Sequence, residues 1–176
     1  MRVGSHPVIE STEPTDPIEA AVVAALDASG VPYQLMPCDP DFADTAVFCE
    51  RYGVAPEMSA NTIVVASKAE PKQYCACVVT ATTKLDVNGT VRRLLGAKKA
   101  SFASAEETNE LTGMLIGGVT AVALPPGLPL YVDAAVMEQP EVIIGGGSRS
   151  LKVRVSPDLF RALPGATVVE GLAVSR

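Results

Sequence analysis

The sequence predicts an α+β fold with a mixed, mostly antiparallel sheet flanked by short helices. Its 176 residues suit one domain. Two pairs of β-rich segments, 61–66 with 74–81 and 141–144 with 151–155, are each joined by a short polar or glycine-rich turn, which is typical of antiparallel hairpins. Because helices and strands are mixed without a regular strand–helix repeat, we expect α+β rather than a doubly wound parallel sheet.

The composition describes an ordinary folded chain with an acidic balance. Hydrophobic residues make up 48% and charged residues 19%, whereas aromatic residues are scarce at 5%, so the core must be aliphatic. The net charge of −6 offers no general basic surface, and we expect no DNA partner. Two local basic groups could still contact RNA: Arg92, Arg93, Lys98 and Lys99, and Arg149, Lys152 and Arg154.

Cysteine and histidine usage speaks against a metal centre. Of the four cysteines, Cys75 and Cys77 form a C-x-C pair that would share one face of a strand, and the single histidine is His6. We therefore expect no metal, and free buried thiols in a reducing cytosol. No segment resembles a secretory signal, and no apolar run approaches the roughly 20 residues of a membrane span. A cytoplasmic protein without a membrane partner is expected.

The N-terminal region divides into a tail and the start of the domain. Residues 1–15 are polar and contain two prolines, which predicts a disordered tail before a domain at 16–176. Asp16 before Pro17 is typical of a helix start. Apolar residues then recur at helical spacing until a glycine stops the helix. An edge strand is expected at 31–36, because a proline lies at its start.

The middle of the chain alternates short helices and strands. A helix is expected at 42–52, followed by the first hairpin. A further helix begins at Asp86 or Asn88 and ends at Gly96, before a short strand at 98–102.

A glycine-containing stretch follows the next helix. Ser104 and Glu107 match a capping box, and the helix they begin should end at Gly113, which takes positive φ cheaply. Gly117 and Gly118 lie among aliphatic residues and indicate backbone that is approached closely. Bare N–H groups there could hold a carbonyl or an oxyanion. The alternative is a buried bend between two strands, and spacing alone favours that bend.

Three polar residues in the closing third each remain open to two interpretations. Asp133 ends a hydrophobic strand at 130–133, where it either serves a site or, as spacing favours, caps the next helix. Ser148 and Arg149 lie on the glycine-rich hairpin, where they contact an anion or form a solvated turn. With His6 in the tail, no Ser-His or Cys-His centre is expected. No G-x-G-x-x-G or Walker motif indicates a nucleotide cofactor.

A series of motifs, taken in order, resembles one family. The sequence resembles the YbaK family, also called the prolyl-tRNA synthetase associated domain, over residues 18–163. This family includes free-standing deacylases of mischarged tRNA and an editing insertion in bacterial prolyl-tRNA synthetases. The matching motifs are TIVVAS at 62–67, LGAKK at 95–99, ASAEE at 103–107, LTG at 111–113, IGG at 116–118 and VD at 132–133.

The resemblance implies a barrel-like mixed sheet and a pocket for the aminoacyl ester at the 3′ end of tRNA. It implies no metal and no protein nucleophile, and no cofactor is expected. In the family, a lysine at the start of a strand orients the substrate, and a glycine loop resembling G-x-x-x-P shapes the pocket. Water, or the substrate's own side chain, attacks the ester.

The sequence departs from the family pattern at two places. Asn61 stands where the family has the lysine, and asparagine cannot place an ammonium against the ester or a phosphate. Thr120 retains a hydroxyl near the loop end, but the family's proline is replaced by Ala121. Lys68 and Lys84 flank neighbouring strands, and either could replace the missing charge.

The resulting hypothesis is an aminoacyl-tRNA deacylase that clears mischarged tRNA in trans, with a synthetase as a second candidate partner. The alternative is a catalytically impaired relative that binds aminoacyl-tRNA, an amino acid or a synthetase; a hydrolase of another small acyl ester is a third reading. The expected catalytic residues are Asn61, Gly117, Gly118 and Thr120. The expected substrate-binding residues are Gly113, Val119, Asp133, Gly146 and Arg149.

Overall fold

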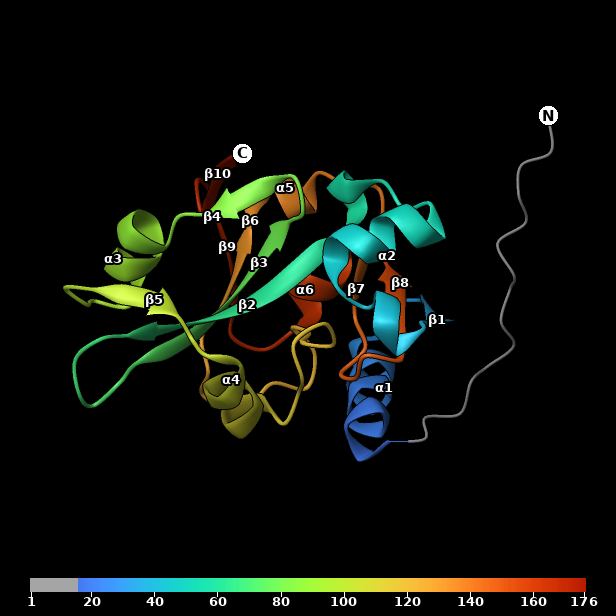
Figure 1. The fold of residues 1–176 in the computed structure, drawn as a ribbon, viewed down its shortest axis with the longest axis horizontal. Coiled ribbons are helices and arrows are strands. Elements are labelled where there is room, and N and C mark those ends of the chain that lie inside the picture. The colour runs from blue at the N-terminus through green and yellow to red at the C-terminus, as the bar shows by residue number, and fades with distance from the viewer. Residues whose placement is uncertain (1–15) are drawn as a thin grey trace.

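Three sheets carry the fold within residues 16–176, which the computed structural model describes (Figure 1). The tail expected at 1–15 lies outside the described residues. The largest sheet has the order β5-β2-β3-β6-β9, with bounds β5 Ala100–Phe102, β2 Ala60–Ser67, β3 Tyr74–Thr80, β6 Leu130–Asp133 and β9 Ala166–Val169. The second has the order β1-β8-β7, and the third pairs β10 with β4; their bounds are β1 Tyr33–Pro37, β8 Leu151–Val155, β7 Val142–Gly145, β10 Ala173–Ser175 and β4 Thr83–Leu85.

Short helices flank these sheets. The longest of the described helices is α1, with 13 residues. The α-helices are α1 Pro17–Ser29, α2 Thr45–Tyr52, α3 Arg92–Leu94, α4 Ala105–Thr112, α5 Ala134–Met137 and α6 Asp158–Ala162. Single turns of other helix types are η1 Pro40–Phe42, η2 Pro56–Met58 and η3 Val87–Val91. None of the helices in the described range is long and apolar enough to cross a bilayer.

The strand pairing is mixed and mostly antiparallel, as the sequence predicts. Both expected hairpins form, β2 with β3 and β7 with β8. Strands β1 and β5 also pair in antiparallel fashion with their neighbours, and β1 is an edge strand as expected. Strand β6 runs parallel to both β3 and β9, which makes the largest sheet mixed.

The barrel-like closure that the family resemblance implies is wrong for this chain. The largest sheet ends in two edge strands, β5 and β9, which do not pair with each other. Strands β1, β7 and β8 form a separate sheet, so no continuous ladder returns to the start. Closing a barrel requires every strand to find two neighbours, and the three-residue β5 is too short to extend the ladder.

Local sequence signals set the helix ends. The Asp16 side chain accepts a hydrogen bond from the N–H of Ile18 at 2.7 Å, and Gly30 ends α1 with a φ of 71°. The capping box forms reciprocally between Ser104 and Glu107. Gly113 ends α4 in the left-handed conformation, as expected.

Several elements differ from the sequence-based expectation. The helix expected at 42–52 starts only at Thr45, because the chain first makes the η1 turn. Strands β4, β9 and β10 have no counterpart among the predicted elements. Each is short and mostly exposed or half-buried, so its apolar pattern is weak. Strand β9 pairs with β6, and β4 pairs with β10. These are tertiary contacts, and they decide the conformation of the three strands.

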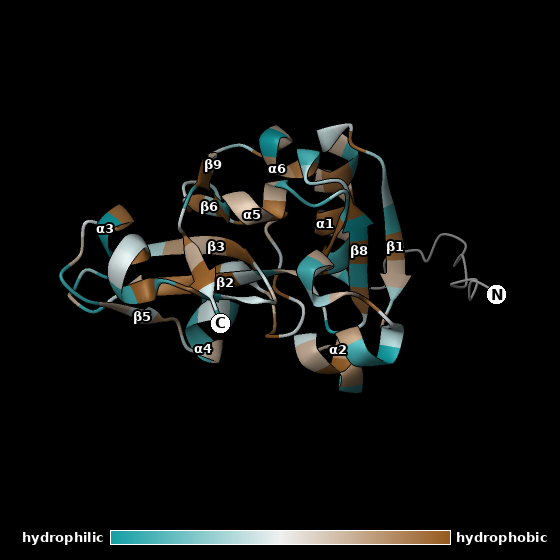
Figure 2. Cartoon of the chain, turned by 90° about the horizontal axis from the view of Figure 1, so that it is seen from above, coloured by the Kyte–Doolittle hydropathy of each residue, from teal (hydrophilic) through white to brown (hydrophobic). Residues whose placement is uncertain are grey.

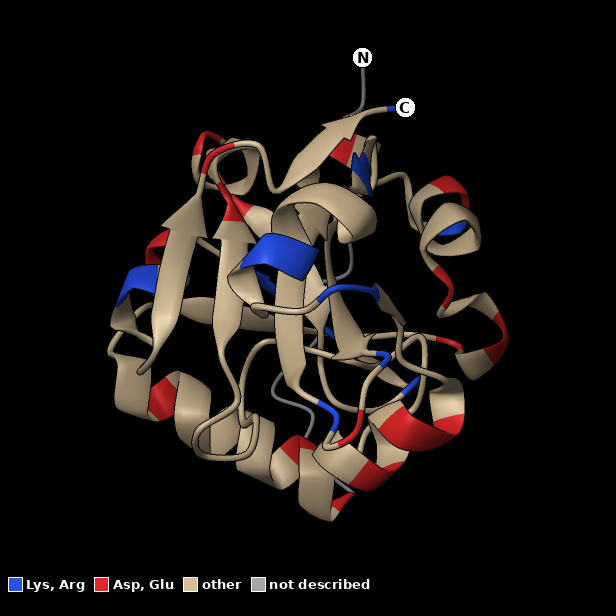
Figure 3. Ribbon diagram, turned by 90° about the vertical axis from the view of Figure 1, so that its left-hand side faces the viewer, with Lys and Arg blue, Asp and Glu red and all other residues tan. Residues whose placement is uncertain are grey.

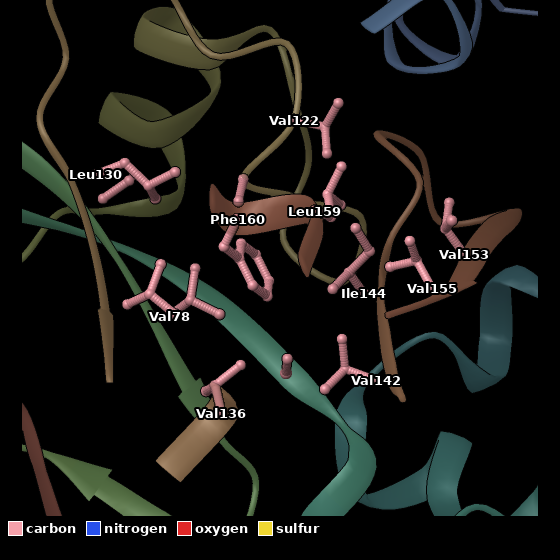
Figure 4. Close-up of a cluster of buried hydrophobic side chains, with 14 of the residues drawn as sticks. Val78, Val122, Leu130, Val136, Val142, Ile144, Val153, Val155, Leu159 and Phe160 are labelled. Atoms are coloured by element: carbon pink, nitrogen blue, oxygen red, sulfur yellow. The ribbon is translucent and has the colours of Figure 1, made fainter. Parts of the chain in front are cut away.

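An aliphatic core joins the large sheet to the second sheet. Figure 4 shows side chains from β3, β6, β7, β8, α5 and α6 meeting in one cluster. Strand β3 is hydrophobic along most of its length (Figure 2), because both of its faces are covered. Each fully buried Val, Leu or Ile contributes roughly 1.5–3 kcal/mol relative to exposure. The core therefore fixes the two sheets relative to each other.

The four cysteines are free and buried, as expected. The Sγ atoms of Cys75 and Cys77 lie 3.8 Å apart on one face of β3. Both side chains are fully buried and pack in a second cluster between β3 and the β4–β10 pair, with Leu85 and Leu172.

A capping glutamate should make stability depend on acid pH. A hydrogen bond from Lys72, with further bonds from the Ser104 backbone and Tyr74, lowers the pKa of Glu107 from 4.5 to about 2. A depressed folded-state pKa contributes stability above the unfolded value, which is lost as pH falls through the folded value. Native protein should therefore melt above Glu107→Gln at pH 7, and this difference should shrink between pH 4.5 and 2.

Glu106→Gln is the matched control, because Glu106 lies in the same helical turn and no ion pair in residues 16–176 includes it. A difference in melting temperature between native and Glu107→Gln that stays constant down to pH 2 would contradict the assignment.

Candidate active site

A pocket of about 380 Å³ lies where β2 and the β7–β8 hairpin meet α2 and the loop after α4. Residues 113–121 form that loop, which we call the glycine loop. The volume is near the lower end of the range for ligand pockets, roughly 300–1,000 Å³, and suits an acyl group better than a nucleoside. The polar lining residues are Asp44, Thr45, Ser59, Asn61, Thr62, Thr108 and Lys152.

Asn61 lies near the start of β2, half-buried in the wall of the pocket. Its Oδ1 accepts hydrogen bonds from the hydroxyls of Thr45 at 2.9 Å and Ser59 at 3.4 Å. These two bonds hold the amide plane and leave the Nδ2 hydrogens available to a ligand, since an amide NH₂ can only donate. The structure thus brings this predicted residue into the pocket as a neutral donor.

Three successive carbonyl groups of the glycine loop are held from outside the loop. The Ile116 carbonyl accepts from the Arg149 guanidinium at 2.8 Å. The Gly117 carbonyl accepts from Lys152 Nζ at 2.7 Å, and the Gly118 carbonyl accepts from the N–H of Gly147 at 2.8 Å. Because peptide groups are planar and trans, fixing each carbonyl also fixes the direction of the N–H that follows it.

Two N–H groups of the glycine loop remain available. The N–H of Gly118 donates to the Leu115 carbonyl at 2.8 Å and is therefore committed to a turn. In residues 16–176 no protein acceptor takes the N–H of Gly117 or of Val119, and both residues line the pocket. In a trans peptide the N–H points opposite to the carbonyl of the preceding residue. The fixed carbonyls of Ile116 and Gly118 therefore orient the N–H groups of Gly117 and Val119. Pre-oriented backbone donors of this kind can stabilise an oxyanion.

The glycines themselves are required by close packing. A Cβ on Gly118 would lie 2.8 Å from the Cα of Ser148 and closer still to its carbonyl group. A Cβ on Gly145 would overlap the carbonyl oxygen of Val119. The glycine loop and the β7–β8 hairpin are therefore in backbone-to-backbone contact. The buried-bend interpretation therefore explains why residue 118 is glycine. The available N–H groups belong to its neighbours, Gly117 and Val119.

Lys152 is the charged residue at the centre of the site. It projects from β8, its side chain is buried, and it lines the pocket. Its Nζ donates to the carbonyls of Ala43 at 2.8 Å and Gly117 at 2.7 Å. It also lies 5.2 Å from the centre of the Phe48 ring. One lysine thus joins β8, the segment before α2 and the glycine loop.

The charge of Lys152 is not neutralised by an ion pair. No carboxylate oxygen in the described residues lies within 4.0 Å of its Nζ, and Asp44, the lining carboxylate, pairs instead with Arg149 at 3.0 Å. Burial lowers the pKa of Lys152, with a smaller lowering by Arg149 and opposing effects of Cys38, Asp44 and Cys49. A cation among carbonyl dipoles favours a ligand that carries or develops negative charge.

Several residues expected in the site lie elsewhere. Gly117 and Val119 line the pocket, but the other expected residues of the two glycine-containing segments do not: Gly113, Gly118, Thr120 and Gly146. Thr120 is fully buried and its Oγ1 has no hydrogen-bond partner among the described residues. Asp133 occupies the N-cap position of α5, but its side chain makes no capping hydrogen bond there. Its Oδ1 instead accepts a hydrogen bond from the N–H of Ala173 at 3.2 Å and so anchors β10.

The Arg149 side chain connects neighbouring segments by hydrogen bonds and is not an open anion site. Its guanidinium donates to the Pro40 and Ile116 carbonyls and to the Asp44 carboxylate. Lys68 and Lys84, which the sequence suggested as replacements for the family lysine, are exposed and do not line the pocket.

The sequence indicated Lys152 only as part of a local basic group that could contact RNA, and not as a residue of the pocket. In the segment LKVRV, polar residues alternate with apolar ones, which is typical of a strand with one solvated face. At Lys152 that face of β8 is covered by the segment before α2, by Phe48 of α2 and by the glycine loop, and only the tertiary structure shows this.

The comparison with protein families agrees with this site. The family model for the aminoacyl-tRNA editing domain matches residues 39–163, which is more than half of the chain. The chain belongs to the aminoacyl-tRNA editing domain family. The match includes Asn61, the glycine loop and Lys152, and it confirms the resemblance that the sequence motifs indicated.

Two solved structures are similar to this editing domain over nearly their whole length. The hypothetical protein APE2540 is 28% identical with a TM-score of 0.74, covering 84% of this chain and 97% of its own. A candidate trans-editing enzyme for prolyl tRNA synthetase is 26% identical with a TM-score of 0.75, covering 89% of this chain and 98% of its own.

The contact between the two glycine-containing segments predicts a steric cost. Gly118→Ala should lower the free energy of unfolding by about 2–3 kcal/mol, because the backbone of Ser148 cannot rotate aside. Gly165→Ala is the control: its φ is +73°, but its Cβ would meet nothing within 4 Å, so backbone strain of about 1 kcal/mol should act alone. Urea unfolding measures the free energy of unfolding of both variants. An equal decrease in Gly118→Ala and Gly165→Ala would refute the packing explanation.

Proposed function

We propose that this editing domain is an aminoacyl-tRNA deacylase that hydrolyses the ester of mischarged tRNA in trans. One observation carries the proposal: the pocket combines the available N–H groups of Gly117 and Val119 with the buried, unpaired ammonium of Lys152. The similarity to a candidate trans-editing enzyme for prolyl tRNA synthetase supports the substrate class. We further propose mischarged tRNA as the partner, with a synthetase as the second partner that supplies it.

The proposed reaction needs stabilisation of charge and no protein nucleophile. A water oxygen attacks the ester carbonyl carbon, and the carbonyl electron pair moves onto its oxygen. The N–H groups of Gly117 and Val119 stabilise this oxyanion, and Asn61 Nδ2 orients the substrate by donating to one of its oxygens. Collapse then breaks the bond to the ribose oxygen, which takes a proton from the attacking water. The products are a free amino acid and a tRNA with a free terminal hydroxyl.

Lys152 supplies the positive charge that Asn61 cannot. In the family pattern, a lysine at the start of the strand that corresponds to β2 orients the substrate. Here the cation enters the same pocket from β8, held against the carbonyl of Gly117. The ammonium adds a fixed positive charge to the wall that carries the two N–H donors. It acts on the reaction both by this charge and by holding the glycine loop in position.

A second candidate function is binding without turnover, and Asn61 is the observation that favours it. A neutral residue at the family's lysine position fits a domain that holds an aminoacyl-tRNA end or an amino acid without cleaving it. Deacylation assays with tRNAs charged with Cys, Ala, Ser, Thr and Pro discriminate the two. Hydrolysis of one of them well above the buffer rate supports the deacylase, whereas saturable binding with no hydrolysis supports the binding domain.

Exchanging the position of the cation tests the role of Lys152 directly. Lys152→Met should lower kcat/KM roughly 100-fold, since removing one electrostatic stabiliser typically costs 10²–10³ in rate. Asn61→Lys combined with Lys152→Met should regain part of this loss, because it returns a cation to the pocket wall. Lys84→Met is the control for an exposed lysine and should leave kcat/KM unchanged.

Circular dichroism and thermal melting of each variant separate lost activity from lost structure. A folded Lys152→Met that keeps native kcat/KM would remove Lys152 from the mechanism.

A further inference from the structure

A strip of unpaired basic residues leads to the edge strand β5. Lys68 follows β2, and Lys98 and Lys99 precede β5; all three are exposed. No carboxylate in the described residues lies within ion-pair distance of them, in contrast to Lys72 and Arg149. Figure 3 shows lysine and arginine segments on this side of the molecule, on and near α3, with acidic segments around them. Three exposed lysines without an ion-pair partner thus lie on one part of a chain whose net charge is −6.

The strip is fixed by the sheet. The N–H of Lys68 donates to the carbonyl of Lys99 at 3.0 Å, directly beyond the paired residues Ser67 and Ala100. The lysines therefore project from one end of the β2–β5 ladder. From Lys99 to Phe102, the strand spans about 10 Å at roughly 3.3 Å per residue. A few nucleotides of extended single strand bridge that distance.

Phe102 stands between the strip and the pocket. It lines the pocket, yet it is 57% exposed, whereas Phe48 and Phe160 are almost completely buried. Ile116 of the glycine loop, which also lines the pocket, is 50% exposed. An exposed aromatic ring at a pocket entrance, next to unpaired lysines, is the combination that single-stranded nucleic acid recognises: bases stack on the ring and phosphates contact the cations.

We propose that the single-stranded 3′ end of tRNA binds along this strip, with its terminal base stacked on Phe102 and preceding phosphates contacting Lys68, Lys98 and Lys99. We call this surface the acceptor-strand platform. It delivers the terminal ribose to the pocket entrance, and the aminoacyl group enters the pocket beside Asn61. This inference rests on the proposed function for the identity of the RNA, but the platform itself is testable by binding alone.

The test uses a labelled RNA hairpin with a single-stranded ACCA 3′ overhang, without an amino acid. Fluorescence anisotropy at several salt concentrations gives Kd and its salt dependence for each variant. Phe102→Ala should raise Kd about tenfold, within the range for loss of one stacked base. Lys98→Gln with Lys99→Gln should reduce the slope of log Kd against log salt by about 1.4, from about 0.7 for each single-strand phosphate contact.

Matched controls change the same chemistry elsewhere on the surface. Lys84→Gln removes an exposed lysine on β4, and Val174→Ala truncates a half-exposed apolar residue on β10. Both should leave Kd and the salt slope unchanged. Phe102→Leu separates stacking from apolar contact, since it keeps an apolar side chain without a ring, and its Kd should rise nearly as far as that of Phe102→Ala.

The outcomes distinguish this inference from the proposed function. Native-like Kd and salt slope in Phe102→Ala and in the double lysine variant, both folded by circular dichroism, would overturn the platform. Equal affinity for a blunt hairpin without the overhang would overturn it as well. Binding that depends on Phe102 and the lysines, without hydrolysis of any charged tRNA, would support the platform and refute the deacylase. Hydrolysis of a charged tRNA with unchanged kcat/KM in Phe102→Ala and in the double lysine variant would support the deacylase and refute the platform.

Discussion

The ammonium of Lys152 connects the parts of the site. It bonds two backbone carbonyls, of Ala43 and Gly117, that belong to segments far apart in sequence, and it does so from a third segment, β8. A lysine has three donors, and two of them are used on groups that would otherwise be buried without partners. Removing the ammonium would leave both carbonyls unsatisfied and would release the glycine loop from β8.

The same contact has an electrostatic consequence. Carbonyl oxygens solvate the ammonium without cancelling its charge, whereas the neighbouring carboxylate of Asp44 pairs with Arg149. Burial lowers the pKa of Lys152, because its surroundings stabilise the ammonium less well than water does. Negative charge that develops in the pocket is therefore stabilised more strongly than it would be in solvent.

The glycine loop and the β7–β8 hairpin depend on each other in a different way. Their backbones touch at Gly118 and Gly145, where a side chain would overlap the backbone of the other segment. This contact places the Gly118 carbonyl on the N–H of Gly147 and so turns the N–H of Val119 in the opposite direction. Close packing, which spacing favoured as the explanation of the glycines, is thus also what orients the available donors.

The sequence by itself determined the local elements and the family. Caps at Asp16 and Ser104, the glycine that ends α4, and the two hairpins follow from interactions between residues close in the chain, and these were predicted. Only the tertiary structure decided that the sheets stay open, that Asp133 and Arg149 are structural anchors, and that Lys152 faces the pocket. A strand's alternation gives two faces but not what covers each of them; at Lys152 the cover comes from residues 35 and 109 positions away in sequence.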